Sequence, residues 1–266
     1  MNEEYIADRL LSQFIASSCR RLGIDVGVLS DGWVLELRKG DDTKWVVGYH
    51  FDVDGAAATM VAKDKVAAYQ ALQRGNVPAV AHYLARSAAS MQVPYGSLDG
   101  AAHNVPYIAK PLQGSGGRRF TLHQTLQDAL QAIEVTPGDW TISPAMSIVR
   151  EKRIIMLNGD SLLAYIKTKP QQIGGVWMYN LGHGAQPIDE QANSEELLLA
   201  RRAMKACGLR LAAVDIVTLA SGDVQVLEVN AGIMMEHYAR LSHKHHARAQ
   251  AVYDAIVTAL FNDITK

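Results

Sequence analysis

Cysteine and net charge are both scarce in this sequence. Only two cysteines, Cys19 and Cys207, occur in 266 residues. Two are too few for a disulfide framework, and they lack the spacing of metal ligands, so we expect buried, reduced thiols. The 26 Lys and Arg residues nearly balance the 27 Asp and Glu residues, which gives a formal net charge of −1. A charge so close to zero favours neither a nucleic-acid partner nor binding to an anionic membrane.

Long apolar runs are absent as well. The first residues lack a basic segment followed by an apolar one, and no later stretch is long and apolar enough to span a bilayer. We therefore expect a cytoplasmic protein with no membrane partner. The composition, with 48% apolar and 20% charged residues, is typical of a soluble globular protein, and the length predicts one compact unit of two or three subdomains. Whether the chain forms a homo-oligomer is left open.

The order of the expected elements predicts an α+β architecture. Strands and helices alternate without the regular rhythm of a doubly wound sheet, which favours mixed sheets with helices packed on one side. Apolar periodicity and terminal residues predict helices over 3–22, 64–75, 122–133, 194–207 and 244–261. Strands are expected over 26–37, 44–49 and 105–110, in a hairpin over 148–167 around Asn158-Gly159, and in a second hairpin over 214–230, with an irregular stretch over 174–187.

The second hairpin carries acids inside its strands. Apolar, β-branched runs flank Ser221-Gly222, and a turn at those two residues places Asp215 opposite Glu228, with Asn230 on the same face. Opposed like charges are destabilising unless a cation lies between them, and two carboxylates with an amide oxygen suit Mg²⁺. The alternative is a surface hairpin with solvated acids. Against it, both faces are apolar, with Val217, Val224 and Val226 on the acid face and Val214, Ile216, Leu227 and Val229 on the other.

A glycine-rich loop follows the strand that ends at Lys110. It contains Gly114, Ser115, Gly116 and Gly117, and glycine is needed where backbone amides must approach a phosphate closely. By itself the loop is equally a plain surface turn, and Lys110 a solvated amine.

Five motifs occur in order over about residues 62–237. They are Asp64-Lys65 before Gly75-Asn76-Val77-Pro78, Lys110 before the glycine-rich loop, Glu151-Lys152-Arg153 before an apolar hairpin, Asn180-Leu181-Gly182-His183-Gly184, and Val214-Asp215-Ile216 with Glu228-Val229-Asn230. Together they resemble the ATP-grasp ligases, and within them the ribosomal-protein glutamate ligases and the cyanophycin synthetases. The resemblance implies the ATP-grasp fold, with ATP gripped between two α/β subdomains, 61–142 and 143–266, after a small N-terminal α/β region, 1–60.

The resemblance also implies the roles of individual residues. Lys65, Lys110, Lys167 and the loop Gly114, Ser115, Gly116 and Gly117 would bind ATP. Asp215, Glu228 and Asn230 would hold two Mg²⁺ ions, with Mn²⁺ as the alternative metal. Arg153 would stabilise the transferred phosphoryl group, although pairing with Glu151 on an exposed strand is the alternative. Asn180 would contact phosphate or substrate, although it is also a common turn residue.

The function implied is an ATP-dependent carboxylate–amine ligase that acts through an acylphosphate on an amino acid or short peptide and releases ADP and phosphate. A small-molecule kinase on the same fold and a non-catalytic nucleotide-binding module are the alternatives. Two features depart from the family: Ile142–Ser147 holds no acid for the ribose, and Met178 replaces the arginine of the glutamate ligases. After Asn230 the chain has a Met-x-His ending, Met235-Glu236-His237, that is closer to the cyanophycin synthetases. On that resemblance His237 would face the acceptor, and the alternative is a structural histidine. The short N-terminal region suggests a small acceptor. The cluster His243–His246 is read as a solvated helix start.

Overall fold

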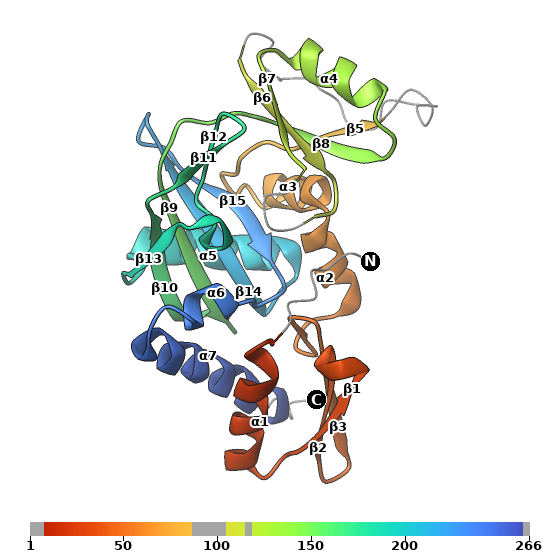
Figure 1. The fold of residues 1–266 in the computed structure, drawn as a ribbon, viewed down its shortest axis with the longest axis vertical. Coiled ribbons are helices and arrows are strands. Elements are labelled where there is room, and N and C mark those ends of the chain that lie inside the picture. The colour runs from red at the N-terminus through yellow and green to blue at the C-terminus, as the bar shows by residue number, and fades with distance from the viewer. Residues whose placement is uncertain (1–7, 87–104, 115–118, 263–266) are drawn as a thin grey trace.

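The computed structural model describes residues 8–86, 105–114 and 119–262. Within these ranges three larger sheets follow one another along the molecule, from the N-terminal region to the end that carries α4 (Figure 1). Their strand orders are β1-β2-β3-β4, β13-β10-β9-β14-β15 and β5-β8-β6-β7, and β11-β12 form a separate hairpin. The α+β class is confirmed. The expectation of mixed sheets is wrong, because neighbouring strands of the described sheets pair antiparallel.

The N-terminal region is one helix packed on a small sheet. Its elements are α1 (Leu11–Leu22), β1 (Asp25–Leu29), β2 (Val34–Lys39), β3 (Asp42–Val47) and β4 (His50–Phe51). The helix predicted over 3–22 begins at Leu11, and residues 1–7 lie outside the described part of the chain. The strand predicted over 26–37 is two strands, because Ser30-Asp31-Gly32 reverses the chain with positive φ at each residue.

The next region carries short helices and a four-stranded sheet. Its elements are α2 (Ala56–Lys63), α3 (Lys65–Arg74), β5 (Tyr83–Arg86), β6 (Tyr107–Pro111), β7 (Thr121–His123), α4 (Leu126–Glu134) and β8 (Asp139–Pro144). Asp64 caps the first amides of α3, and Gly75 ends the helix, as predicted. The helix predicted over 122–133 starts at Leu126, because Thr125 and Asp128 form a capping box there and residues 121–123 pair with β6.

The large sheet is built from two long hairpins and one short strand. Its strands are β9 (Ile148–Leu157), β10 (Asp160–Thr168), β13 (Gln186–Asp189), β14 (Leu211–Leu219) and β15 (Val224–Asn230). Asn158-Gly159 joins β9 to β10 with positive φ at both residues, which confirms the first predicted hairpin. The prediction of an irregular stretch over 174–187 is wrong. It contains β12 (Val176–Met178), the turn η3 (Leu181–His183) and the start of β13, and β11 (Gln171–Ile173) directly precedes it; these elements are too short to show a periodicity.

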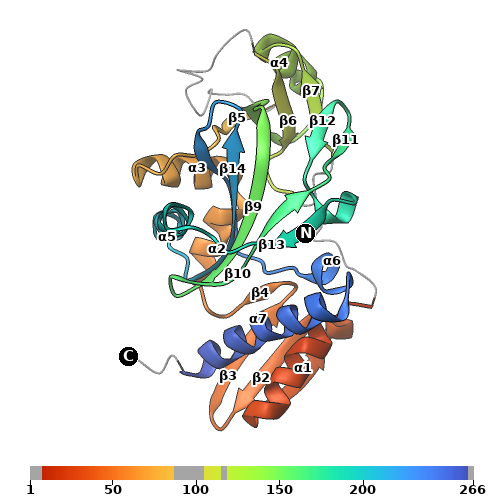
Figure 2. The ribbon, with the colours of Figure 1, turned by 90° about the vertical axis from the view of Figure 1, so that its left-hand side faces the viewer.

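Helices cover the large sheet on two sides. On one face lies α5 (Ser194–Cys207), whose bounds agree with the prediction, and α2 and α3 lie beside it (Figures 1 and 2). The last helix, α7 (His243–Asn262), follows α6 (Glu236–Ala239) and packs between the sheet and the N-terminal region. Both cysteines are buried free thiols, as expected, and burial raises the pKa of each to about 11.

Candidate active site

The acidic hairpin brings Asp215 opposite Glu228, as predicted, but by a different path. The ladder next to the turn pairs Thr218 with Val224, so the turn is longer by one residue than the two-residue turn at Ser221-Gly222. A β-bulge then inserts Leu227 between the pairs Ile216 with Val226 and Asp215 with Glu228. The predicted two-residue turn is wrong, but the bulge restores the pairing of Asp215 with Glu228 that such a turn would give.

The bulge changes which side chains share the acid face. Val226 is fully buried in the core beneath α5, and Leu227 packs against a small cluster around Val217 on the acid face. The sequence predicted the reverse, with Val226 on the acid face and Leu227 on the other face. Strict alternation counted from the turn cannot detect an inserted residue. The prediction that the hairpin is enclosed on both sides agrees with these two clusters.

One row across the large sheet positions the candidate catalytic groups. Strand register places Tyr165, Arg153, Asp215 and Glu228 side by side on β10, β9, β14 and β15. Residues opposite one another in a sheet point to the same face. The neighbouring row pairs Lys167 with Glu151. The residue between Glu151 and Arg153, Lys152, faces the other way and forms a buried ion pair with Glu196 of α5, at 2.6 Å.

Arg153 forms a two-pronged ion pair with Asp215. Its Nε lies 2.8 Å from Asp215 Oδ1 and a terminal nitrogen lies 2.6 Å from Oδ2. The alternative, a pair with Glu151 on an exposed strand, is wrong: Glu151 is buried and receives a hydrogen bond from Lys167. The Lys167 amine also lies 3.1 Å from Asp215 Oδ1. Two cations therefore share the Asp215 carboxylate.

These cations control the charge of Asp215. Burial opposes its ionisation, but Arg153 and Lys167 outweigh burial and lower the pKa of its carboxyl to about 2. In the same way, burial alone would lower the pKa of Lys167, and the carboxylates of Asp215 and Glu151 raise it instead. Asp215, Arg153 and Lys167 are therefore all charged at neutral pH.

The oxygen atoms of the acidic hairpin suit a hard divalent cation. The Asn230 amide nitrogen lies 3.4 Å from Asp215 Oδ2 and 3.4 Å from Glu228 Oε2, so the three side chains converge on one point. A half turn of this amide would present its oxygen there, and two carboxylates with one amide form a donor set that fits Mg²⁺. In the described part of the chain no three His, Cys, Asp or Glu side chains gather, so this candidate set consists of two acids and an amide.

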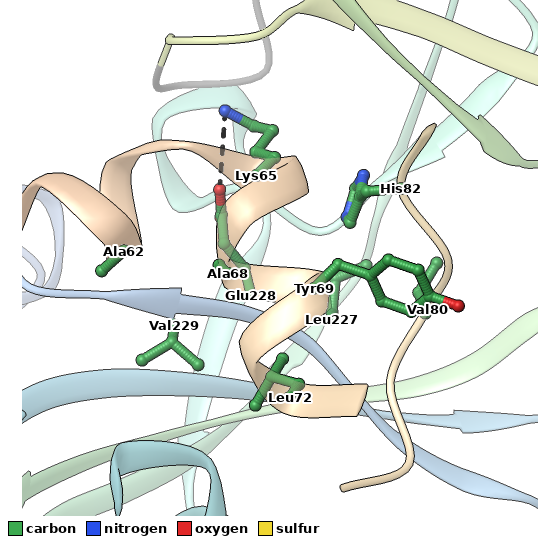
Figure 3. A pocket seen from close by; sticks show the side chains of 10 residues that line it. All are labelled: Ala62, Lys65, Ala68, Tyr69, Leu72, Val80, His82, Leu227, Glu228 and Val229. Carbon is green, nitrogen blue, oxygen red and sulfur yellow. Dashed lines mark ion pairs between the residues drawn. The ribbon is translucent and has the colours of Figure 1, made fainter. Parts of the chain in front are cut away.

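Two lysines reach the acidic hairpin from other elements. Lys65, at the first position of α3, donates to the Gly114 carbonyl at 2.7 Å and lies 3.9 Å from Glu228 Oε1 (Figure 3). Lys110 ends the predicted strand on β6. Burial lowers the pKa of Lys110 to about 8, with Glu228 opposing the shift and Lys65 adding to it. Of the predicted loop, Gly114 is described, and Ser115, Gly116 and Gly117 lie outside the described residues.

Asn180 forms a turn in the structure. Its side-chain oxygen accepts the Gly182 amide hydrogen at 2.7 Å and caps η3. A Cβ atom on Gly182 would lie 3.0 Å from His237 Nε2, so the Asn-Leu-x-x-Gly motif and the Met-x-His ending meet here. The catalytic role expected for Asn180 stays a prediction. His243, Lys244 and His246 are exposed at the start of α7, which agrees with the solvated helix start.

Sequence reasoning missed three buried residues around this site. Tyr165 lies next to Arg153 in register, Glu236 binds the start of α1, and His82 lies beside both lysines. Burial, and then Lys110 and Lys65, lower the pKa of His82 well below its usual value, so the ring is neutral. Tyr165 and His82 are single polar residues in apolar stretches, and Glu236 follows two methionines; the sequence offers no further signal.

Comparison with known proteins identifies the family. The model of the RimK-like ATP-grasp domain matches residues 62–251, which is most of the chain. The chain belongs to the RimK-like ATP-grasp family. The resemblance stated from the motifs is therefore confirmed, and so is the ATP-grasp fold. Members of this family use ATP, and the paired lysines and acidic hairpin lie within the matched range.

Relatives and solved structures extend this result. A probable alpha-L-glutamate ligase of Trichodesmium erythraeum (strain IMS101) is 27% identical over 191 residues, which cover 70% of this chain and 61% of that protein. A bifunctional glutathione synthetase from Pasteurella multocida has a TM-score of 0.61 at 16% identity, over 96% of this chain and 43% of the other.

The macrocyclase MdnC from Microcystis aeruginosa MRC, bound with precursor peptide MdnA, has a TM-score of 0.57 at 12% identity, over 96% of this chain and 98% of the other. At these identities the two structures show the fold alone. None of the helices in the described residues has the length and apolar character needed to cross a membrane.

Proposed function

We propose that this chain is an ATP-dependent ligase that forms an amide between a carboxylate and an amine and releases ADP and phosphate. The observation that carries the proposal is the position of Glu228, which lies 3.9 Å from the Lys65 amine and in the row that aligns Arg153 with Asp215. This arrangement puts cations for phosphates and oxygen ligands for a metal on one face. Two subdomains, 61–142 and 143–266, would supply these groups, with residues 1–60 beside them.

The chemistry requires activation of the carboxylate, because oxide is too poor a leaving group for an amine to displace. A carboxylate oxygen attacks the γ-phosphorus of ATP, the bond to the β,γ-bridging oxygen breaks, and ADP leaves. The amine then attacks the acyl carbon, a C–N bond forms, the C–O bond to phosphate breaks, and the amine loses a proton. In this reaction Lys65, Lys110 and the loop Gly114–Gly117 would hold the phosphates, and Asn180 would contact phosphate or substrate.

Asp215, Glu228 and Asn230 would hold Mg²⁺, and we propose two ions, with Mn²⁺ as the alternative. Bound there, the metal would neutralise negative charge on the phosphates of ATP. Arg153 and Lys167 pair with Asp215 in the structure. We propose that Arg153 also stabilises the transferred phosphoryl group, because a fixed guanidinium stabilises developing negative charge.

We propose an amino acid or a short peptide as the substrate that supplies the carboxylate. The relatives include probable alpha-L-glutamate ligases, and a structural neighbour that is matched over 98% of its length binds a precursor peptide. Met178 stands where the glutamate ligases carry arginine, so a substrate other than glutamate is the expected result.

The test measures ADP and free phosphate released with Mg-ATP across pools of amino acids and dipeptides, with mass spectrometry of each active mixture. A product one water lighter than its two substrates, with stoichiometric phosphate, supports the ligase. ADP without free phosphate, together with a phosphorylated product, assigns the kinase instead. No turnover in any pool, with tight Mg-ATP binding, contradicts the ligase on these substrates and favours a binding module. The Glu228→Gln variant is the control for contaminating ATPases.

A further inference from the structure

A buried histidine joins the two ATP-binding sheets. His82 is 6% exposed and directly precedes β5. The segment before it runs along β15: the Val80 amide donates to the Val226 carbonyl, and the Val226 amide donates to the Pro78 carbonyl, both at 2.9 Å. His82 is thereby held beside the part of β15 that carries Glu228.

His82 spans both sheets. Its ring Nδ1 lies 2.7 Å from Ser143 Oγ and 3.4 Å from Thr141 Oγ1, both on β8. On the other side the ring lines a pocket with Leu227 and Glu228 of β15, the strand to which Pro78 and Val80 are hydrogen-bonded. Because β8 and β15 belong to different sheets, one residue bridges them.

The residues around His82 are those that would handle the nucleotide. It lines one pocket with Lys65, Tyr69 and Glu228, and Figure 3 shows these side chains arranged around the turn of α3. The Tyr69 ring meets the imidazole edge-on, with 6.4 Å between centroids. Thr141 lies directly opposite Lys110 in the pairing of β6 with β8. The imidazole thus contacts the strand next to Lys110 and the residue before Glu228.

A direct chemical role does not fit this environment. The Nδ1 atom is bonded to Ser143 and the residue is only 6% exposed, so the ring is not open to a substrate. The absence of charge also matters, because a third cation beside Lys65 and Lys110 would be repelled by both. What remains is a mechanical role between the two sheets.

We propose that His82 is a positioning residue that sets the separation between Lys110 on one sheet and Glu228 on the other. Held in this way, Lys110 and Glu228 would contact one Mg-nucleotide, the lysine at its phosphates and the carboxylate at its metal. This inference rests on the proposed function only in requiring a Mg-nucleotide as ligand, and it does not depend on which carboxylate or amine is joined.

The test compares ADP binding with Mg²⁺ and with EDTA, by isothermal titration calorimetry at a temperature where each variant is folded. Ser143→Ala removes the 2.7 Å hydrogen bond between the imidazole and β8, and His82→Phe removes the same bond while keeping a ring. Each should reduce the gain in affinity that Mg²⁺ gives by about fivefold, the effect of losing one net hydrogen bond. Affinity in EDTA should change by less than about twofold, because the lysines still contact the phosphates.

Two further variants separate positioning from packing. Ser143→Thr keeps the hydroxyl and should retain the full Mg²⁺ effect. Ser18→Ala removes another buried serine hydroxyl, far from the site on α1, and should do the same. An unchanged Mg²⁺ effect in Ser143→Ala and His82→Phe, or an equal loss with Mg²⁺ and with EDTA, would overturn the inference.

The same titration distinguishes failure of this inference from failure of the ligase proposal. If the wild-type protein binds ADP without any gain from Mg²⁺, the metal ligands and the role of His82 are both contradicted. If the gain depends on His82 in a protein that joins no substrates, the positioning role stands and the ligase proposal fails.

Discussion

Asp215 shows how one side chain can serve two states of the site. In the structure its two oxygens are occupied by Arg153 and Lys167, and its side chain is almost fully buried. The proposed metal would use the same oxygens. Removing this carboxylate would therefore remove a proposed metal ligand and leave Arg153 and the buried Lys167 without their shared partner. Glu228, 35% exposed and 3.9 Å from Lys65, is held more loosely. The two acids should respond differently to the same chemical change.

Glu228→Gln should abolish Mg-dependent ATP use with little loss of stability. A lost metal contact at the phosphates costs about 100-fold or more in turnover, while a half-exposed ion pair contributes about 0–1 kcal/mol to folding. Phosphate release and urea unfolding measure the two effects. Glu36→Gln, a partly exposed acid paired with Arg38 in the N-terminal sheet, is the matched control and should change neither. Wild-type turnover in Glu228→Gln would refute the metal assignment.

Asp215→Asn should lower the free energy of unfolding by about 2–4 kcal/mol, besides abolishing turnover. Breaking a buried ion pair by removing one partner leaves the other charge uncompensated, and here two cations, Arg153 and Lys167, lose their shared partner. The measurement is urea unfolding beside wild type. A variant as stable as wild type would show that the two cations find other partners.

Lys110 should give ADP binding a dependence on alkaline pH. Burial lowers the pKa of its amine from 10.5 to about 8, so above pH 8 the free protein loses a charge that attracts phosphate. The dissociation constant of Mg-ADP should rise between pH 7 and 9.5, and in Lys110→Arg it should stay level. Burial of the charged Lys110 amine lowers the free energy of unfolding below pH 8. Because the folded chain loses this proton first, that penalty disappears as pH rises from 8 toward 10.5. A flat profile in the wild-type protein would contradict this.

At the level of elements, the acidic hairpin shows why local patterns can give a correct pairing through wrong details. The turn is one residue longer than predicted, and the bulge at Leu227 compensates for it, so Asp215 still lies opposite Glu228. The bulge also directs Leu227 and Glu228 toward the same side, one into a cluster with Val80 and the other toward Lys65. Two neighbouring residues thus serve one face, which strict alternation forbids.

The start of α1 depends on a residue from the other end of the chain. Leu10, at its N-cap, offers no side-chain cap, and the Glu236 carboxylate accepts the amide hydrogens of Leu10 and Leu11 at 2.9 and 3.1 Å. A carboxylate at a helix N-terminus satisfies free amides and opposes the helix dipole. Glu236 follows the loop that continues from Asn230, so it connects the end of β15 to the N-terminal region.

Glu236→Gln should lower the free energy of unfolding by about 1–3 kcal/mol, because a buried charged hydrogen-bond acceptor is replaced by a neutral one. Denaturant unfolding followed by far-UV circular dichroism measures this. Glu134→Gln, at the exposed end of α4, changes the same chemical group without such partners and should lie within about 0.5 kcal/mol of wild type. Equal values for the two variants would contradict the capping role.

At the scale of the whole molecule, a shared hydrophobic core joins the N-terminal region to the large sheet and α7. Phe14 of α1 and Tyr253 of α7 stack with ring centroids 5.3 Å apart, and the same core includes Leu35 of the N-terminal sheet and Ile155 of the large sheet. The carboxylate of Asp54 also accepts amide hydrogens from Arg210 and Leu211, which binds the end of the N-terminal region to β14. The N-terminal region is thus part of the support for the large sheet.

A chain that lacks residues 1–55 should therefore not reach wild-type stability. Its α7 would expose the apolar side that α1 and Phe51 cover, and buried apolar area contributes about 25 cal/mol per Å². We expect a lower melting temperature and binding of a hydrophobic dye. Removing residues 263–266, which lie beyond α7, is the comparison and should leave melting unchanged. A truncated chain with wild-type melting would show that residues 56–262 fold independently.

Local signals determined a large part of this protein from its sequence. Helix ends at Asp64, Gly75, Asn193 and Gly208 and the turn at Asn158-Gly159 follow from backbone and side-chain preferences within a few residues, so those elements were predicted almost to the residue. The order of the motifs predicted the family in the same way. Short strands such as β11 and β12, and the turn at Ser30–Gly32, escaped because three or four residues carry no periodicity.

The tertiary structure decided which groups meet. Arg153 pairs with Asp215 on the next strand rather than with its near neighbour Glu151, and Glu236 caps a helix 225 residues away in the chain. His82 joins two sheets that come together only when the chain is folded. Strand register, a bulge and the packing of distant segments fix these partners, and no pattern within a short stretch of sequence contains that information.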